Sequence, residues 1–142
     1  MKKTKPKWRV KDRTRLLLAI MQALAGDAQI SFEGDLRHFR LSQFAGASQK
    51  ETAALRRSTF WPKQGFVVVP LEPGTETAIL SAISGQVPKR IIHIQIEKEG
   101  VLQFGAYDNF NPECLFWGPG LKNSLFDSLT AQEVLEVASG VP

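Results

Sequence analysis

The sequence predicts an α+β domain in which an antiparallel sheet of about five or six strands carries helices packed mainly on one face. Three observations predict this class: an apolar helical segment near the N-terminus, short alternating segments after it, and a turn signal that joins two of them at residues 90–107. A chain of 142 residues with 43% hydrophobic content supports one core. We therefore expect a basic N-terminal arm at residues 1–11 and a single domain at residues 12–142.

The first helix is expected over residues 12–25, because an apolar run there ends at Gly26, a residue that readily takes the left-handed helix-end conformation. Cations before this run also give it the layout of a secretory signal. Arg15 and Gln22 fall on one helix face, however, and leave a narrow polar stripe that favours a helix packed on a sheet. We therefore expect a core helix in a cytoplasmic protein, rather than a secretion signal.

Residues 28–41 are expected to form a hairpin. Residues 28–33 alternate between apolar and polar, and Gly34-Asp35 suits a two-residue type II′ turn, after which residues 36–41 would return antiparallel. The competing interpretation makes residues 35–44 an irregular crossing.

The middle of the chain predicts a helix, a strand and a second helix. Ser-Gln-Lys-Glu at residues 48–51 is a capping box, which predicts a short helix to about Arg57. The run Phe-Val-Val-Val at residues 66–69 is typical of a strand buried on both faces, and Pro70 places its end or a sheet edge there. A further helix is expected over residues 75–84.

The hairpin at residues 90–107 is the clearest local structure. Three isoleucines alternate with polar residues, and Glu-Lys-Glu-Gly at residues 97–100 suits a three-residue hairpin loop. This loop predicts an apolar face with the pairs Ile96–Leu102, Ile94–Phe104 and Ile92–Ala106, and it places His93 opposite Gly105. A strand at residues 114–117 and a helix started by a capping box at residues 130–133, running to about residue 138, complete the chain. The aromatic residues expected mainly in the core are Trp61, Phe66, Phe104, Phe116 and Trp117.

The positive charge is concentrated at the N-terminus. Although the net charge is +4, residues 1–15 alone carry +7 and the rest of the chain carries −3. A basic arm with one aromatic residue is a candidate contact for nucleic-acid phosphates, whereas a solvated terminus is the alternative. The nucleic-acid candidates are Lys2, Lys3, Lys5, Lys7, Trp8, Arg9, Lys11 and Arg13.

A second candidate surface is the rim, residues 107–113, which is rich in polar and aromatic residues and follows a strand end. Loops on a rigid hairpin are where binding residues concentrate, although Asp and Asn are equally favoured in purely structural turns. The candidate residues for binding a ligand or partner are His93, Tyr107, Asp108, Asn109, Phe110, Asn111 and Glu113.

The motifs of most cofactor and catalytic sites are missing from the sequence. It has no Gly-rich phosphate loop, no Gly-x-Ser-x-Gly elbow and no metal-ligand spacing, and its single cysteine, Cys114, excludes an intramolecular disulfide. We therefore expect no cofactor, no metal and no catalytic residue, and with no apolar run of about 18 residues we expect no membrane partner.

The function we predict is a small, non-catalytic binding or interaction module that contacts another protein or a small ligand through the rim, with a homo-oligomer left open. One alternative is contact with nucleic acid or an anionic surface through the basic arm. The other is a small hydrolase or transferase in which His93 acts with Asp108 or Glu113.

Overall fold

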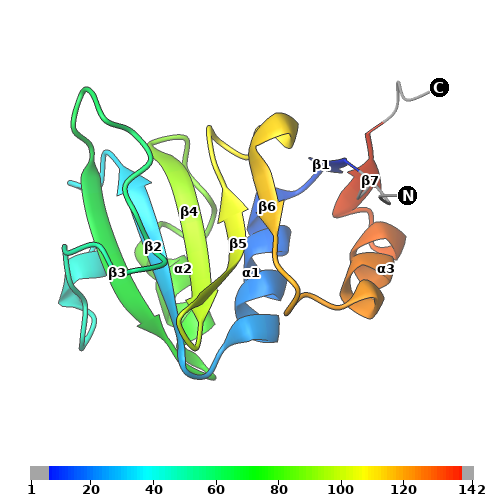
Figure 1. The fold of residues 1–142 in the computed structure, drawn as a ribbon, viewed down its shortest axis with the longest axis horizontal. Helices are drawn as coiled ribbons and strands as arrows, with labels where there is room; N and C mark the ends of the chain where they lie inside the picture. Colours follow the sequence, from blue (N-terminus) through cyan, green and yellow to red (C-terminus); the bar gives the residue numbers. More distant parts are fainter. Residues whose placement is uncertain (1–6, 139–142) are drawn as a thin grey trace.

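The computed structural model describes residues 7–138 and has the α+β architecture that the sequence predicts. A five-stranded antiparallel sheet in the order β3-β2-β4-β5-β6 forms its body, and a two-stranded sheet of β1 and β7 lies beyond β6 (Figure 1). The strands are β1 (Trp8–Val10), β2 (Ala28–Gly34), β3 (Gly65–Leu71), β4 (Ile91–Lys98), β5 (Val101–Ala106), β6 (Leu115–Trp117) and β7 (Leu135–Val137). The helices are α1 (Arg13–Leu24), α2 (Thr75–Ala82) and α3 (Asn123–Ala131), with short 3-10 turns η1 (Leu41–Gln43) and η2 (Pro112–Cys114).

Helix α1 is a core helix. The Asp12 side chain caps it by accepting a hydrogen bond from the Arg15 amide, and its apolar side, including Leu16 and Ile20, is fully buried. Three carbonyl oxygens at its C-terminal end, those of residues 24–26, accept hydrogen bonds from the Lys98 ammonium at 2.6–3.2 Å. Among the described residues, no helix is long and apolar enough to cross a bilayer.

The two faces of the large sheet are covered differently. Helices α1 and α2 lie behind the sheet in Figure 1 and pack on a face that includes Phe32, Ile94 and Phe104. The opposite face is covered by the chain between η1 and β3, from which Leu55 packs against Phe66 and Val68. The helices are therefore on one face, as the sequence predicts, and an irregular segment covers the other.

The predicted hairpin at residues 28–41 is wrong, and the irregular crossing is correct. Strand β2 is central and pairs with β3 on one side and β4 on the other, so residues 36–41 have no free edge of β2 to pair with. The chain leaves the strand where the Asp35 amide donates to the Arg90 carbonyl at 3.0 Å. Strand β3 is an edge strand of the sheet, which confirms the position expected from Pro70.

Both capping boxes predict helices that do not form. Ser48 instead pairs with Val68 as an isolated bridge beside β3, while its hydroxyl accepts from the Lys50 amide. In the second box, Thr130 lies in the last turn of α3, where its hydroxyl donates to the Phe126 carbonyl. Residues 135–137 form β7 because they pair with β1, a contact across the whole chain that a local pattern does not contain.

The hairpin of β4 and β5 exists, but its register differs from the prediction. The turn is a two-residue turn at Glu99 and Gly100, both left-handed with φ of 53° and 83°, rather than a three-residue loop. The predicted pairs Ile96–Leu102, Ile94–Phe104 and Ile92–Ala106 are therefore wrong. A bulge near Gln103 shifts the register, so that Ile96 pairs with Phe104 and Ile94 pairs with Ala106 on the apolar face. Gly105 lies opposite Gln95 and not opposite His93.

Candidate functional site

The face of the sheet away from the helices carries a polar cluster, which consists of Ser31, Glu33, His93 and Gln95. Three of these side chains are buried, with Ser31 1%, Glu33 1% and Gln95 4% exposed. Buried polar groups require hydrogen-bond partners, and among the described residues no buried side-chain polar atom lacks one. Those partners come largely from the irregular segment above the sheet, so the cluster determines where that segment lies.

Glu33 holds the base of a protruding loop, residues 57–64, which we call the aromatic loop. One carboxylate oxygen accepts from the Ser58 amide at 2.7 Å and the other accepts from the Thr59 amide at 3.1 Å. Hydrogen bonds to an ionised acceptor are roughly twice as strong as neutral ones. Two successive amides on one buried carboxylate therefore hold the loop in a single orientation.

His93 joins the aromatic loop to the rim. Its Nδ1 accepts from the Asp108 backbone amide at 3.1 Å, and its Nε2 lies 2.6 Å from the Thr59 hydroxyl. Because a backbone amide only donates, Nδ1 carries no proton, and the ring is neutral with its proton on Nε2. Burial lowers the pKa of His93, against the opposing charges of Glu33 and Asp108, which agrees with this neutral form.

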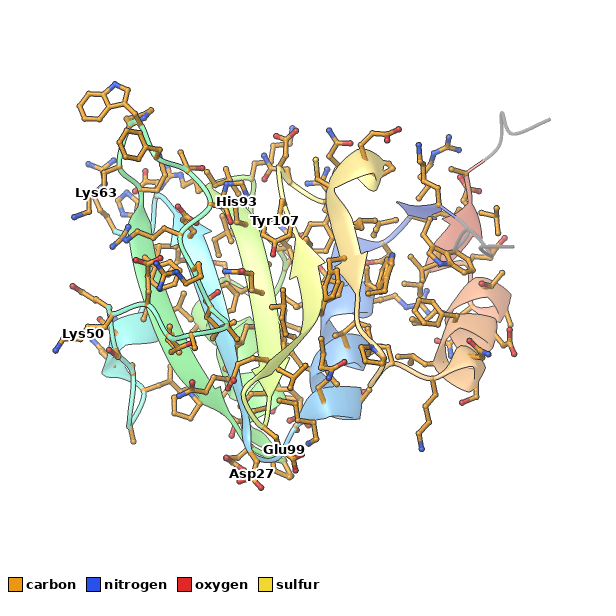
Figure 2. All side chains as sticks on the ribbon, viewed as in Figure 1. Asp27, Lys50, Lys63, His93, Glu99 and Tyr107 are labelled. Carbon is orange, nitrogen blue, oxygen red and sulfur yellow. The ribbon has the colours of Figure 1, made fainter. Side chains whose placement is uncertain are left out.

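Gln95 bonds within the cluster and to Tyr107 of the rim. The Gln95 amide nitrogen donates to the Ser31 hydroxyl at 3.1 Å and to the Arg56 carbonyl at 2.8 Å, while its oxygen accepts from the Tyr107 hydroxyl at 3.1 Å. The Tyr107 ring lies across Gly105, where a Cβ atom would collide with it. Burial raises the pKa of Tyr107, so its hydroxyl remains a donor. Figure 2 shows His93 and Tyr107 close together at the end of the sheet toward which the aromatic loop extends.

The aromatic loop presents two large apolar side chains to solvent. Phe60 is 96% exposed and Trp61 is 81% exposed. The expectation that Trp61 belongs to the core is therefore wrong, and Phe116, at 40% exposed, is also partly outside it. Adjacent aromatic residues inside a Pro- and Gly-containing turn were the signal for this feature, because a turn places its side chains at the surface.

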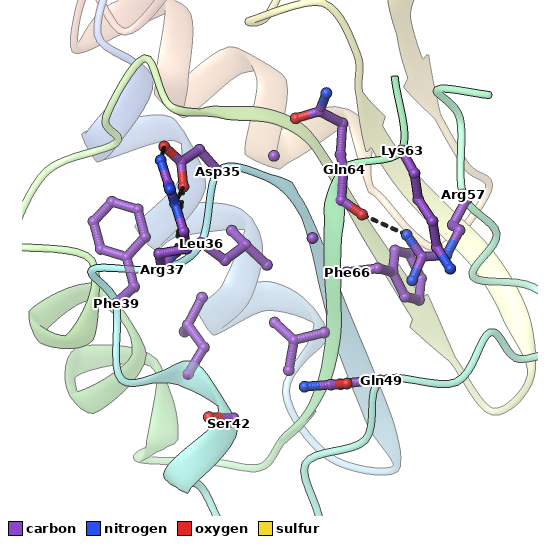
Figure 3. Close-up of a pocket in the computed structure, with 14 residues that line it drawn as sticks. Asp35, Leu36, Arg37, Phe39, Ser42, Gln49, Arg57, Lys63, Gln64 and Phe66 are labelled. Atoms are coloured by element: carbon purple, nitrogen blue, oxygen red, sulfur yellow. Dashed lines mark hydrogen bonds and ion pairs between the residues drawn. The ribbon is translucent and has the colours of Figure 1, made fainter. Parts of the chain in front are cut away.

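A groove of about 720 Å³ lies beside the base of the aromatic loop, between residues 34–42 and the start of β3 (Figure 3). Its polar side includes Arg57, Lys63 and Gln64, and its apolar side includes Leu36 and Phe39. At one end Arg37 forms an ion pair with Asp35 at 2.9 Å, and its hydrogen bonds hold the pKa of Asp35 at about 2. No local sequence pattern predicts this groove, since its walls come from segments that are distant along the chain.

Most of the rim is bonded within itself. Asp108, Asn109 and Phe110 are three successive left-handed residues with φ of 52°, 55° and 62°, and the Asp108 carboxylate accepts from the Asn111 side chain at 3.0 Å. Phe110 is buried, and the Arg13 guanidinium lies 5.9 Å from its ring centroid. Most side chains of the rim thus act as a structural turn, and the exposed ones are those of Asp108 and Glu113.

The described part of the basic segment packs against the C-terminal part of the chain. Residues 8–10 form β1, and Trp8 stacks on Phe126 with ring centroids 5.5 Å apart. Trp8 therefore packs against the fold, although it belongs to the segment predicted as a basic arm. The ion pairs of this segment are Lys7–Glu113 at 2.6 Å, Arg9–Glu136 at 3.0 Å and Lys11–Glu133 at 3.9 Å. Lys2, Lys3 and Lys5 lie outside the described residues.

The groups named for acid–base chemistry do not converge on His93. The Asp108 backbone, and not its carboxylate, bonds to the ring, and Glu113 instead pairs with Lys7. Within residues 7–138, no group of three His, Cys, Asp or Glu side chains is placed to hold a metal ion. The buried carboxylate near His93 is that of Glu33, and both of its oxygens already accept backbone amides.

Comparison of the chain with models of protein families, with curated protein sequences and with solved structures finds no match.

Proposed function

We propose that this protein is a non-catalytic binding module, and that the aromatic loop is its main recognition element. The observation that carries this proposal is the exposure of Phe60 and Trp61, 96% and 81%, on a loop whose base is bonded to the buried carboxylate of Glu33. Exposed adjacent aromatic residues are typical of binding sites, where they contribute a large share of the binding energy. A loop already held in place also loses less conformational entropy when it binds.

The polar cluster supports a positioning role. Each of its groups is occupied by a hydrogen bond to the aromatic loop, to the rim or within the cluster, so the side chains that resemble acid–base residues hold two surface segments in place. The partner that we propose is another protein, and the exposed side of the rim at Asp108 borders the same surface. A cytoplasmic location is part of the proposal and is supported by the single cysteine.

Site-specific photo-crosslinking in the source cells tests this function. A photo-reactive amino acid at position 61 is expected to give a discrete crosslinked species. The same group at Val101, an exposed apolar residue at 53% on the β4–β5 turn, is the matched control. Phe60→Ala combined with Trp61→Ala should abolish co-purification of the crosslinked partner. Equal crosslinking from both positions, or co-purification unaffected by the double variant, would contradict the proposal.

A further inference from the structure

We propose that the groove beside the aromatic loop binds an extended acidic segment of the partner, which adds to the free edge of β3 as a further strand. This inference rests on the proposed function and names the chemistry of the partner. Three observations support it. The backbone groups at the β3 edge point toward the groove, one wall of the groove is cationic while the other is apolar, and two of its cations form no ion pair with the described residues.

The edge of β3 is only partly occupied. The Val68 amide donates to the Ser48 carbonyl at 2.7 Å, and its carbonyl accepts from the Ser48 amide at 2.9 Å, so both groups point away from β2. Backbone groups alternate along an antiparallel strand, and those of Phe66 therefore point the same way, toward the groove. The covering chain turns away after Ser48, where the Lys50 amide bonds to the Ser48 hydroxyl. A partner strand can continue from that point, and main-chain bonding of this kind supplies affinity in strand addition.

The cationic wall is organised for carboxylates. The Arg57 guanidinium lies 5.1 Å from the Phe66 ring centroid and donates to the Gln64 carbonyl at 2.6 Å, which holds its plane in place. Lys63 lines the same wall and is exposed. None of the ion pairs within residues 7–138 involves Arg57 or Lys63, whereas Arg37 is already paired with Asp35. The groove therefore has two positive charges to offer to an acidic ligand.

The opposite wall is suited to apolar side chains. Leu36 and Phe39 are half-buried there, on the side of β3 to which Val67 points. Because successive side chains of a strand point to opposite faces, an added segment would place alternate residues against the apolar wall and the others near Arg57 and Lys63. The ligand class is thus an extended peptide that alternates acidic and apolar residues.

The probe is a fluorescent peptide of sequence Glu-Val-Glu-Val-Glu, blocked at both ends, with Lys-Val-Lys-Val-Lys as its charge-reversed control. Fluorescence anisotropy should show binding of the acidic peptide alone. Lys63→Glu, which changes an exposed side chain, should weaken binding about tenfold, and Arg57→Gln with Lys63→Gln at least as much. Lys50→Gln with Lys122→Gln removes the same charge outside the groove and should leave the affinity within about twofold.

N-methylated peptides separate strand addition from simple charge attraction. Methylation of the amides on one set of alternate residues, those facing β3, should abolish binding, whereas methylation of the other set should be tolerated. In an NMR titration, the Phe66 amide should shift downfield on addition of the parent peptide. Equal binding of both methylated peptides, or tighter binding of a single-stranded oligonucleotide of equal charge, would overturn the inference. If no peptide binds while crosslinking from position 61 persists, strand addition is wrong and the proposed function stands.

Discussion

The two faces of the central sheet differ in composition and in what they contact. The face under α1 and α2 is mainly apolar, with Phe32, Ile96 and Phe104 fully buried. The other face combines a small apolar group around Leu55 with the polar cluster, which bonds to surface loops. The comparison shows that the two faces of one sheet can have separate roles. The apolar face contributes most to the stability of the fold, and the polar face determines where the aromatic loop and the rim lie.

The largest effect is expected from truncation on the apolar face. Phe104→Ala leaves a cavity among fully buried neighbours and should lower the free energy of unfolding by about 3–5 kcal/mol. Equilibrium denaturation in urea measures this loss. Leu102→Ala, on the other face of the same strand and partly exposed, is the matched control and should cost clearly less. Equal losses of unfolding free energy in the two variants would show that the two faces contribute equally to stability.

A smaller loss is expected from the polar cluster. Glu33→Gln replaces one of two accepting oxygens with an amino group that faces a backbone amide, and should cost about 1.5–3 kcal/mol in the free energy of unfolding. Glu97→Gln, a change of the same type on the same face of the sheet but away from the loop, should leave crosslinking from position 61 intact. We expect Glu33→Gln to reduce that crosslinking. A variant at Glu33 that is destabilised but crosslinks normally would contradict the positioning role.

The pH dependence of stability follows from His93. Burial lowers its pKa in the folded protein below the ordinary 6.5, so the unfolded chain binds more protons at mildly acidic pH. Stability should therefore fall as the pH drops from about 6.5 toward the pKa of the folded state, and should be insensitive to His93 above that window. The charged groups facing the ring, Glu33 and Asp108, oppose this fall. Denaturation of the wild type and of His93→Gln between pH 5 and 7.5 measures the effect, and parallel profiles would contradict it.

The smallest effect on stability is expected at the tip of the aromatic loop. Phe60→Ala with Trp61→Ala removes side chains that are almost fully exposed, and should change the free energy of unfolding by no more than about 0.5 kcal/mol. The same variant is expected to lose the partner completely. A destabilisation of several kcal/mol in thermal or urea unfolding would show that these side chains serve the fold.

The difference between the faces also explains what the sequence could predict. Helix α1, strand β3 and the apolar face of β4 at Ile94 and Ile96 follow from apolar periodicity, which acts over a few residues. The contacts of the polar cluster join residues that are distant along the chain, such as Glu33 and Ser58, 25 positions apart, or Gln95 and Ser31, 64 apart. Sequence patterns over a few neighbouring residues do not predict contacts between such distant residues.

Tertiary contacts also overrode local signals at particular positions. Instead of starting a helix, Ser48 pairs its backbone with Val68 at the edge of β3. Residues 135–137 form a strand that pairs with β1. The register of the β4–β5 hairpin differs from the predicted one because Glu99 takes a left-handed conformation, which makes a two-residue turn possible. At the candidate site, His93 and Tyr107 were predicted from their place on the hairpin, whereas Glu33 and Phe60 were not.

The most direct test of the account is amide hydrogen exchange at Ser58 and Thr59. Although both residues lie in an irregular surface loop, their amides should exchange slowly at pH 7, at rates near those of strand interiors, and should become fast in Glu33→Gln while β2 remains protected. Rapid exchange of both amides in the wild-type protein would show that the buried carboxylate does not hold the loop.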